Sequence, residues 1–389
     1  MATNNIHILN PGAAASSGCV IVGGGPGASS VSWTAGAGQE TYVTMPAGTI
    51  GGPVRVTVNS GPQVRASQRI RFYSSFNELW AASASQATTT SYFSWYDKAS
   101  AGMLNDNIHL LNPGSPTSPN ATVTVSVPGA SSQTVNVAPG TEAWVTFAQG
   151  TIGGPVTVSS SQPVLASQRV QYKQSFNEVW ASSAARAATK SYFSWFDSTS
   201  AGVASDYIHL LNPGTGIAKV QVQINGSIVE ATVYPGQETY VTFGPGSLWI
   251  HPINCQPAFA CPVPMGGPVN VMSDNPVLAS QRVLFYSSFN EIWSANASQA
   301  TTTSYFNWYD RASPGMQSDN VHVVNLGTTV ATVTVSVPGA SPQTATVSDE
   351  KYFNFPGAIG GPVTVSSTQP MLAAQRVLYY QTFNEIWAG

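Results

Sequence analysis

The chain has 389 residues, of which 42% are hydrophobic and 8% charged, and its formal net charge is −3. The apolar fraction excludes a disordered chain. The lack of a basic stretch argues against nucleic acid and against a polybasic membrane contact. No apolar run is long enough to predict membrane insertion, and the segment from Met1 to Asn5 lacks the basic and apolar regions of an export signal.

Self-similarity divides the chain into four copies of one unit. The predicted domains are repeat 1 at 1–80, repeat 2 at 91–180, repeat 3 at 191–293 and repeat 4 at 304–389. Short linkers rich in Ala, Ser and Thr are predicted at 81–90, 181–190 and 294–303. Units of this size can each bury a core.

Each repeat is predicted to open with an aromatic strand, Ser-Tyr-Phe-(Ser/Asn)-Trp-(Tyr/Phe)-Asp. This motif begins at Ser91, Ser191 and Ser304 and is missing from repeat 1. The sequence therefore predicts an open sheet edge in repeat 1 that could accept a partner strand, or else a chain excerpted from a longer array. Because side chains alternate faces along a strand, some aromatics point outward unless covered. The candidates for core or interdomain packing, for assembly or for glycan stacking are Trp95, Trp195 and Trp308.

A strand with one histidine follows in each copy, at His7, His109, His209 and His322. The lack of a second His or Cys at ligand spacing favours a hydrogen-bonded structural residue, so neither a metal nor another cofactor is expected. In repeat 2, further strands are predicted at 121–127, 134–137, 143–147, 156–159 and 166–172, separated by turn signals. This pattern predicts an all-β chain of four tandem Ig-like β-sandwich domains, with a compact barrel as the alternative.

Repeat 3 carries an insertion at about 246–265. It contains Cys255 and Cys261, which could close a small disulfide loop, or form a zinc site together with His251. Cys19 has no obvious partner.

The last part of each repeat holds an Arg and, nine residues later, the Glu of a Phe-Asn-Glu-aliphatic-Trp motif. We expect partly buried ion pairs that tie the last strand to the following turn, with a ligand contact or an interdomain bridge as alternatives. The four pairs are Arg69 with Glu78, Arg169 with Glu178, Arg282 with Glu291 and Arg376 with Glu385. The tryptophans of the motif, candidates for interdomain or glycan contacts, are Trp80, Trp180, Trp293 and Trp387.

Carboxylate catalysis would require a second group near these glutamates, and the candidates are Asp97, Asp197 and Asp310. No motif couples a nucleophile, a base and an oxyanion donor, so an enzyme is not expected.

The Asn-Pro after the histidine strand and the stretch Pro163–Tyr172 resemble an uncharacterised tandem β-sandwich repeat of large bacterial cell-surface and secreted proteins. That repeat tends to have Glu where this chain has Gln68, Gln168, Gln281 and Gln375, and the Phe-Asn-Glu-Trp end is not part of its pattern. The resemblance implies secretion and a structural or adhesive role, without catalytic residues to transfer.

The sequence therefore predicts an extracellular or cell-surface structural protein, a rod or fibre subunit that associates with itself or with neighbouring repeats. The alternative is a multivalent carbohydrate-binding surface protein, in which four weak sites gain avidity.

Overall fold

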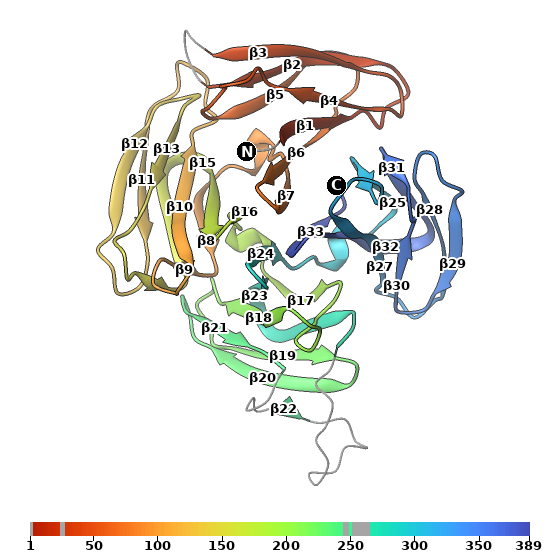
Figure 1. Cartoon of the computed structure of the whole chain (residues 1–389). Coiled ribbons are helices and arrows are strands. Elements are labelled where there is room, and N and C mark those ends of the chain that lie inside the picture. The colour runs from red at the N-terminus through yellow and green to blue at the C-terminus, as the bar shows by residue number, and fades with distance from the viewer. Residues whose placement is uncertain (1–2, 24–27, 244–248, 251–264) are drawn as a thin grey trace.

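The computed structural model describes residues 3–23, 28–243, 249–250 and 265–389. The fold is all-β: the described residues form strands, turns and three short 3-10 helices, with no α-helix among them. None of the described helices is long and apolar enough to cross a membrane. Four groups of strands stand around a common centre, one group for each repeat (Figure 1).

Repeat 2 shows how one complete unit is built. Its elements are η1 (Ala84–Gln86), β8 (Thr88–Phe93), β9 (Tyr96–Asp97), β10 (Met103–Leu111), β11 (Ala121–Ser126), β12 (Gln133–Val137), β13 (Glu142–Val145), β14 (Ile152–Gly153), β15 (Val156–Tyr172) and β16 (Ser175–Trp180). The first half of β15 pairs with β11 and β8, and its second half pairs with β10 and β16. Two antiparallel sheets, β12-β11-β15-β8 and β13-β10-β15-β16, therefore share one long strand.

The apolar core of repeat 2 lies between these two sheets. Alternation along β11 buries Ala121, Val123 and Val125, while Thr122 and Thr124 remain outside and bond to β12. Such alternation is the pattern of a strand with one buried face. Phe93 of the opening strand is fully buried in the same core.

Repeats 3 and 4 have the same arrangement. Repeat 3 comprises η2 (Ala184–Arg186), β17 (Ala188–Phe193), β18 (Val203–Leu211), β19 (Ala218–Ile224), β20 (Ser227–Val233), β21 (Glu238–Val241), β22 (Trp249–Ile250), β23 (Val269–Phe285) and β24 (Ser288–Trp293). Repeat 4 comprises η3 (Ala297–Gln299), β25 (Thr301–Phe306), β26 (Tyr309–Asp310), β27 (Met316–Asn325), β28 (Ala331–Ser336), β29 (Gln343–Val347), β30 (Glu350–Asn354), β31 (Ile359–Gly360), β32 (Val363–Tyr379) and β33 (Thr382–Trp387).

Two details differ from the sequence-based expectations. The strands predicted at 156–159 and 166–172 are one continuous strand, β15, with a register shift between Ser159 and Val164. The last residues of the predicted linkers belong to strands, because β8, β17 and β25 begin at Thr88, Ala188 and Thr301.

Repeat 1 is built with fewer strands. It comprises β1 (Thr3–Leu9), β2 (Ser16–Val22), β3 (Ser29–Ala35), β4 (Glu40–Thr44), β5 (Val54–Ser60), β6 (Arg65–Phe72) and β7 (Ser75–Trp80). Its sheets are β3-β2-β5 and β4-β1-β6-β7, so β5 pairs only with β2 among the described strands. The position that β8 takes in repeat 2 has no strand in the described part of repeat 1.

The four repeats close into a ring. At its centre each of β7, β16, β24 and β33 contacts the next, and β33 contacts β7 again. The indole Nε1 of each motif tryptophan donates to the backbone oxygen of the tryptophan in the preceding copy: Trp180 to Trp80 at 2.7 Å, Trp293 to Trp180 at 2.8 Å, Trp387 to Trp293 at 2.8 Å and Trp80 to Trp387 at 2.8 Å.

This cycle corrects the expectation of a rod. In a rod the first and last repeats are far apart, whereas here Trp80 bonds directly to Trp387. The strands that carry them, β7 and β33, meet at the centre (Figure 1). The tryptophan rings also reach into the preceding repeat, since Trp293 belongs to the core of repeat 2 and Trp387 packs against that of repeat 3. Copy-to-copy contacts therefore curve the array until its ends meet.

Candidate functional site at the junctions between repeats

The Arg–Glu pairs lie side by side on paired strands near the ring centre. Arg69 on β6 stands directly opposite Glu78 on β7, and their side chains are 2.7 Å apart. In the other three pairs the nitrogen-to-oxygen distance is 2.8 Å between Arg169 and Glu178, 3.2 Å between Arg282 and Glu291, and 3.3 Å between Arg376 and Glu385.

The position of the glutamates differs from the prediction. They were expected in the turn after the last strand, but they lie on strands, because the chain reverses just before them at a residue with positive φ such as Tyr73 (φ 54). In repeat 2, Glu178 lies within β16 and stands opposite Arg169 on β15. The correction applies to all four residues: Glu78, Glu178, Glu291 and Glu385.

The opening strand of one repeat meets the ion pair of the next. At the junction of repeats 2 and 3, called junction 2/3, Arg282 Nη1 donates to the backbone oxygen of Trp95 at 3.2 Å. Ser94 Oγ donates to Glu291 Oε1 at 2.6 Å, so both members of the ion pair are held from the neighbouring repeat. The indole of Trp95 packs on the His209 ring, with 5.6 Å between centroids.

Two further junctions repeat this geometry. Trp195 packs on His322 at junction 3/4, and Trp308 packs on His7 at junction 4/1, with centroid distances of 5.7 Å and 5.4 Å. Ser194 Oγ bonds to Glu385 at junction 3/4. At junction 4/1 Asn307 reaches the ion pair through Ser67, which donates to Glu78.

Close backbone contact explains a Gly-Gly-Pro-Val motif that recurs once in each repeat, beginning at Gly51, Gly153, Gly266 and Gly360. A Cβ on Gly154 would stand 2.0 Å from the backbone oxygen of Ser94, and the corresponding distances are 1.8 Å for Gly267 to Ser194 and for Gly361 to Asn307. No side chain fits in that space. The second glycine therefore allows the opening strand to cross the motif.

Each histidine is bonded to a glutamate on the neighbouring strand. His7 Nδ1 lies 2.7 Å from Glu40, His209 Nδ1 lies 2.6 Å from Glu238 and His322 Nδ1 lies 2.7 Å from Glu350; His109 bonds likewise to Glu142. Sequence reasoning missed these glutamates. The signal for them was a Glu that recurs 28 to 33 residues after each histidine.

Burial favours the uncharged forms of two of these pairs, His7 with Glu40 and His209 with Glu238. Desolvation, reinforced by Arg69, lowers the pKa of His7 to about 2, and desolvation raises the pKa of Glu40 to about 8. Burial acts in the same directions on the pKa values of His209 and Glu238. At neutral pH these pairs are held as an imidazole beside a protonated carboxyl group, which suits an apolar indole packed on top.

A buried aspartate anchors each opening strand. Asp106 Oδ2 accepts from the backbone N–H of Asp97 at 2.8 Å and also accepts from Gln168 Nε2. Burial raises the pKa of Asp106 to about 7, and the same holds for Asp206 and Asp319. The catalytic candidates Asp97, Asp197 and Asp310 accept backbone N–H groups of their own turns.

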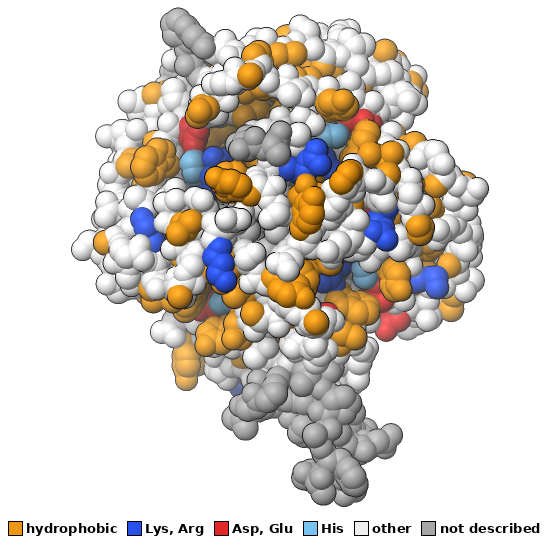
Figure 2. Space-filling model, in the orientation of Figure 1, with side chains coloured by type: hydrophobic (Ala, Val, Ile, Leu, Met, Phe, Trp, Pro, Cys, Tyr) orange, Lys and Arg blue, Asp and Glu red, His pale blue; other side chains and the backbone are white. Residues whose placement is uncertain are grey.

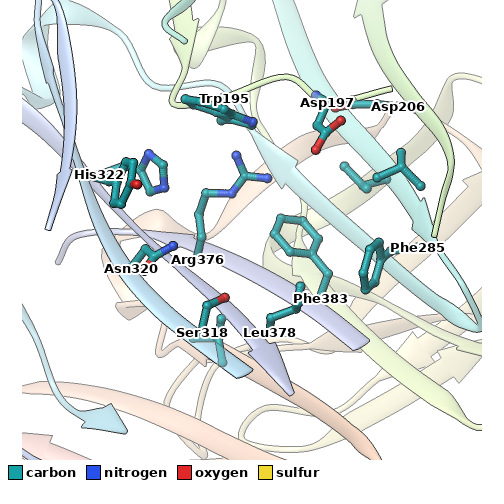
Figure 3. Close-up of a pocket in the computed structure, with 14 residues that line it drawn as sticks. Trp195, Asp197, Asp206, Phe285, Ser318, Asn320, His322, Arg376, Leu378 and Phe383 are labelled. Atoms are coloured by element: carbon teal, nitrogen blue, oxygen red, sulfur yellow. Dashed lines mark hydrogen bonds between the residues drawn. The ribbon is translucent and has the colours of Figure 1, made fainter. Parts of the chain in front are cut away.

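Junction 3/4 contains a cavity of about 240 Å³. The guanidinium of Arg376 projects between His322 and Phe383, with Trp195 above it (Figure 3). Nη1 of Arg376 has no hydrogen-bond partner among the described atoms, unlike the matching atoms of Arg69 and Arg282. The cavity is smaller than the clefts that usually hold drug-sized ligands.

Junction 1/2 differs from the other three. The described part of repeat 1 has no opening strand, and no described ring packs on His109. The side chain of Arg169 is 41% exposed, against 8%, 7% and 14% for the arginines at the closed junctions. Here the hydrogen bond from His109 lowers the pKa of Glu142.

The ion pair at junction 1/2 is also asymmetric. Glu178 is only 7% exposed, so the pair combines a buried carboxylate with a half-exposed guanidinium, whereas the sequence predicted two partly buried partners. The carboxylate of Glu178 accepts from Ser167 Oγ at 2.7 Å and from Arg169 Nη2 at 2.8 Å, both within repeat 2. No side chain of repeat 1 reaches it among the described residues, so the alternative of an interdomain bridge does not hold at Glu178.

A second aromatic set lies on the surface. Tyr42, Trp144, Tyr240 and Tyr352 each stand opposite the histidine of their own repeat on the neighbouring strand, and all are more than half exposed. Sequence reasoning missed them and chose Trp95, Trp195 and Trp308, which are partly buried between repeats. The surface is otherwise poor in charge: Figure 2 shows charged side chains only as scattered spots on one face.

Two further expectations concern cysteine and metal. Cys255, Cys261 and His251 lie outside the described residues, and Cys19 is a free cysteine. No group of three or more metal-ligating side chains occurs within the part of the chain that the structure describes.

Comparisons with known proteins give little. No protein-family model matches the chain, and no curated protein matches it. A solved structure described as a tetra-tandem repeat in the extending region of a large adhesion protein aligns over 99% of this chain and 95% of its own, at 10% identity and a TM-score of 0.10. Such a low score carries no argument about fold or function.

Proposed function

We propose that the chain is an extracellular structural or adhesive protein whose four repeats, each an Ig-like β-sandwich, form one rigid ring that serves as an assembly unit. The observation that carries the proposal is the closed cycle of tryptophan hydrogen bonds. The side chains that recur in every repeat are used mainly to hold repeats together. No catalytic step is part of this proposal.

The outer surface supports lateral association. Strands β12 and β29 pair on one side only within the described chain, and their exposed residues are mainly Thr, Gln and Asn. Edges of this kind can pair with another strand, and the low charge leaves little repulsion between copies. The fibre suggested by the sequence would then consist of rings.

Sedimentation velocity over a range of concentrations tests this role. We expect reversible association that persists at high salt, because few charges are involved. A Thr124→Lys/Thr134→Lys variant places like charges on the outer face of repeat 2 and should weaken association. A ring that stays monomeric at all concentrations would contradict the assembly role.

The alternative is multivalent glycan binding through Tyr42, Trp144, Tyr240 and Tyr352. Four exposed aromatics at one strand position on one ring are arranged for avidity. A glycan array probed with the wild-type chain and with the four-fold Ser variant at these positions tests it. Hits that the variant loses would favour this role, while hits that persist in the variant would count against it.

A further inference from the structure

We propose that junction 1/2 is a docking site for an extended peptide of the Ser-Tyr-Phe-Ser-Trp-Tyr-Asp type that a separate polypeptide supplies. The peptide would add to the free edge of β5, as β8 adds to β15, and would place its tryptophan on His109. This extends the assembly role proposed above by naming a partner chemistry, and it can fail independently of that role.

The first support is a strand-shaped gap. In repeat 2, β8 lies between β15 and Ser182, and Tyr92 exchanges two backbone hydrogen bonds with Ser182, at 2.8 Å and 2.9 Å. In repeat 1, β5 pairs only with β2 among the described strands. Ala82 stands where Ser182 does, and its backbone makes no hydrogen bond to the described residues. The two backbone segments that would hold an opening strand, the edge of β5 and Ala82, are therefore present and unpaired among the described residues.

The second support is an uncovered core. Val54 of β5 is 37% exposed, whereas the matching residues Val156, Val269 and Val363 are 0% exposed under their opening strands. Repeat 1 also has Met45 where the other repeats have a phenylalanine, so it lacks the aromatic pair that Tyr96 and Phe147 form in repeat 2. A docked strand would bury Val54 and supply the counterparts of Phe93 and Tyr96, which the opening strand brings to the core of repeat 2.

The third support is that repeat 2 presents the two side chains, Arg169 and His109, that match those contacting an opening strand at the closed junctions. At junctions 2/3 and 4/1 the arginine donates to the tryptophan carbonyl and the histidine ring carries the indole. Arg169 and His109 occupy these positions at junction 1/2 and have no such partner among the described residues. The site thus offers a guanidinium to a carbonyl and an imidazole to an indole.

The serine of the peptide also has a matching acceptor. At junction 2/3, Ser94 Oγ of the opening strand donates to Glu291 Oε1, and Glu291 also forms the ion pair with Arg282 at 3.2 Å. At junction 1/2 the matching carboxylate is Glu178, which no residue of repeat 1 contacts by a hydrogen bond in the described chain. A docked Ser-Trp segment would therefore reproduce both contacts that hold the ion pair at junction 2/3.

At junction 1/2, no described backbone occupies the place beside Gly52 where an opening strand would cross the Gly-Gly-Pro-Val motif of repeat 1. A Cβ on Gly52 would meet only the carboxylate of Glu142, at 1.9 Å, instead of the backbone oxygen found at the other three motifs. This carboxylate is the flexible end of the partly exposed Glu142 side chain. Docking requires this carboxylate to move aside, and no backbone has to shift.

No opening strand within the described part of residues 3–389 is free to fill the site. The three opening strands of this chain are committed, because Phe93, Phe193 and Phe306 are fully buried, each in the core of its own repeat. A second intact copy would have to unfold a repeat to donate one. A separate polypeptide with an unpaired segment of this sequence is the partner that fits.

Isothermal titration of the full chain with a peptide of residues 88–97 tests the proposal. We expect saturable binding with one site per chain. The matched peptide with Trp95→Ala should bind at least about tenfold more weakly, because a buried aromatic anchor dominates such interfaces. Hydrogen exchange should show new protection at Val54–Thr57 and at Ala82. No saturable binding, or equal binding of the two peptides, would overturn the proposal.

A fused variant separates this site from nonspecific aromatic binding. Residues 88–102 are placed directly before Met1, since Met103 stands six residues before His109 just as Met1 stands six residues before His7. We expect the fused chain to melt at a higher temperature and to lose binding of the free peptide. If it still binds the peptide as the unfused chain does, binding is elsewhere and the proposal is wrong. Concentration-dependent association of rings would remain a separate result in either case.

Discussion

At the scale of single residues, each closed junction depends on a glycine, because a Cβ at that position would collide with the backbone of the opening strand. Gly154→Ala would place a methyl group 2.0 Å from the backbone oxygen of Ser94, which cannot move without displacing β8. We expect a loss of stability of about 2–3 kcal/mol from overpacking, measured by chemical denaturation.

Gly52→Ala is the matched control, because its methyl group meets only the Glu142 carboxylate. The free energy of unfolding should fall by less than about 1 kcal/mol, apart from the small backbone effect of replacing Gly by Ala. Equal losses in the two variants would contradict the view that junction 1/2 is open.

The buried aspartates predict a pH dependence. Asp319 has a folded-state pKa of about 7 against an ordinary value of 3.8, because burial disfavours its charge. A carboxyl group with a raised folded-state pKa contributes its full stability below about pH 4 and loses it as the pH rises towards 7, by about 1.4 kcal/mol per pH unit.

Asp319→Asn removes this titration, and Asn4 shows that Asn is accepted at the matching position, where it accepts from Gln68 at 2.8 Å. As the pH rises from 4 to 7, the wild type should lose up to about 4 kcal/mol of unfolding free energy relative to the variant. A pH-independent difference would show that Asp319 is charged in the folded state.

At the scale of elements, the central strands join the repeats through indole N–H groups. Trp293→Phe removes the bond to Trp180 but keeps an aromatic ring in the core of repeat 2, so we expect a loss of about 1 kcal/mol. Trp293→Ala also leaves a cavity and should cost about 3–5 kcal/mol. Both are measured by denaturant unfolding.

Trp144→Phe is the control for these variants, since Trp144 is 58% exposed on the outer face. Its effect should stay within about 0.5 kcal/mol. A larger effect at Trp144 than at Trp293 would mean that the central cycle does not stabilise the ring.

Element boundaries also show why some sequence expectations differ from the structure. Ser160-Ser161-Gln162-Pro163 has the composition of a turn, but in the structure β15 runs through it with a register shift. In repeat 1 the matching segment contains Gly61 with φ 91, and there the strand does break into β5 and β6. Composition could not separate these cases, because tertiary pairing holds the longer strand together.

At the scale of the whole molecule, a ring and a rod have different dimensions. A compact chain of this length has a radius of gyration of about 21 Å, and four such units in a line would give roughly twice that value. Small-angle X-ray scattering of the monomer should give a value near the compact one. A value near that of the rod would contradict ring closure.

The sequence by itself determined the all-β fold and the Arg–Glu pairs, and it predicted four repeats. These features depend on local periodicity and on partners only nine residues apart, such as Arg69 and Glu78. It also predicted that repeat 1 lacks an opening strand, because the motif occurs three times in the given sequence. The burial of each pair did not follow from the motif, because the neighbouring repeat covers Arg282 and leaves Arg169, the partner of Glu178, half exposed.

Only the tertiary structure decided that the array closes and which aromatics are exposed. Closure joins Trp80 to Trp387 across 307 positions of the chain, and it depends on the angle that side-chain packing sets at each junction. That angle is not encoded in any local pattern, and a small change in it, added over the four junctions, would turn a ring into an open array. For the same reason Trp95 could not be distinguished from Trp144 in advance: whether an aromatic is covered depends on the neighbouring repeat, not on its own strand.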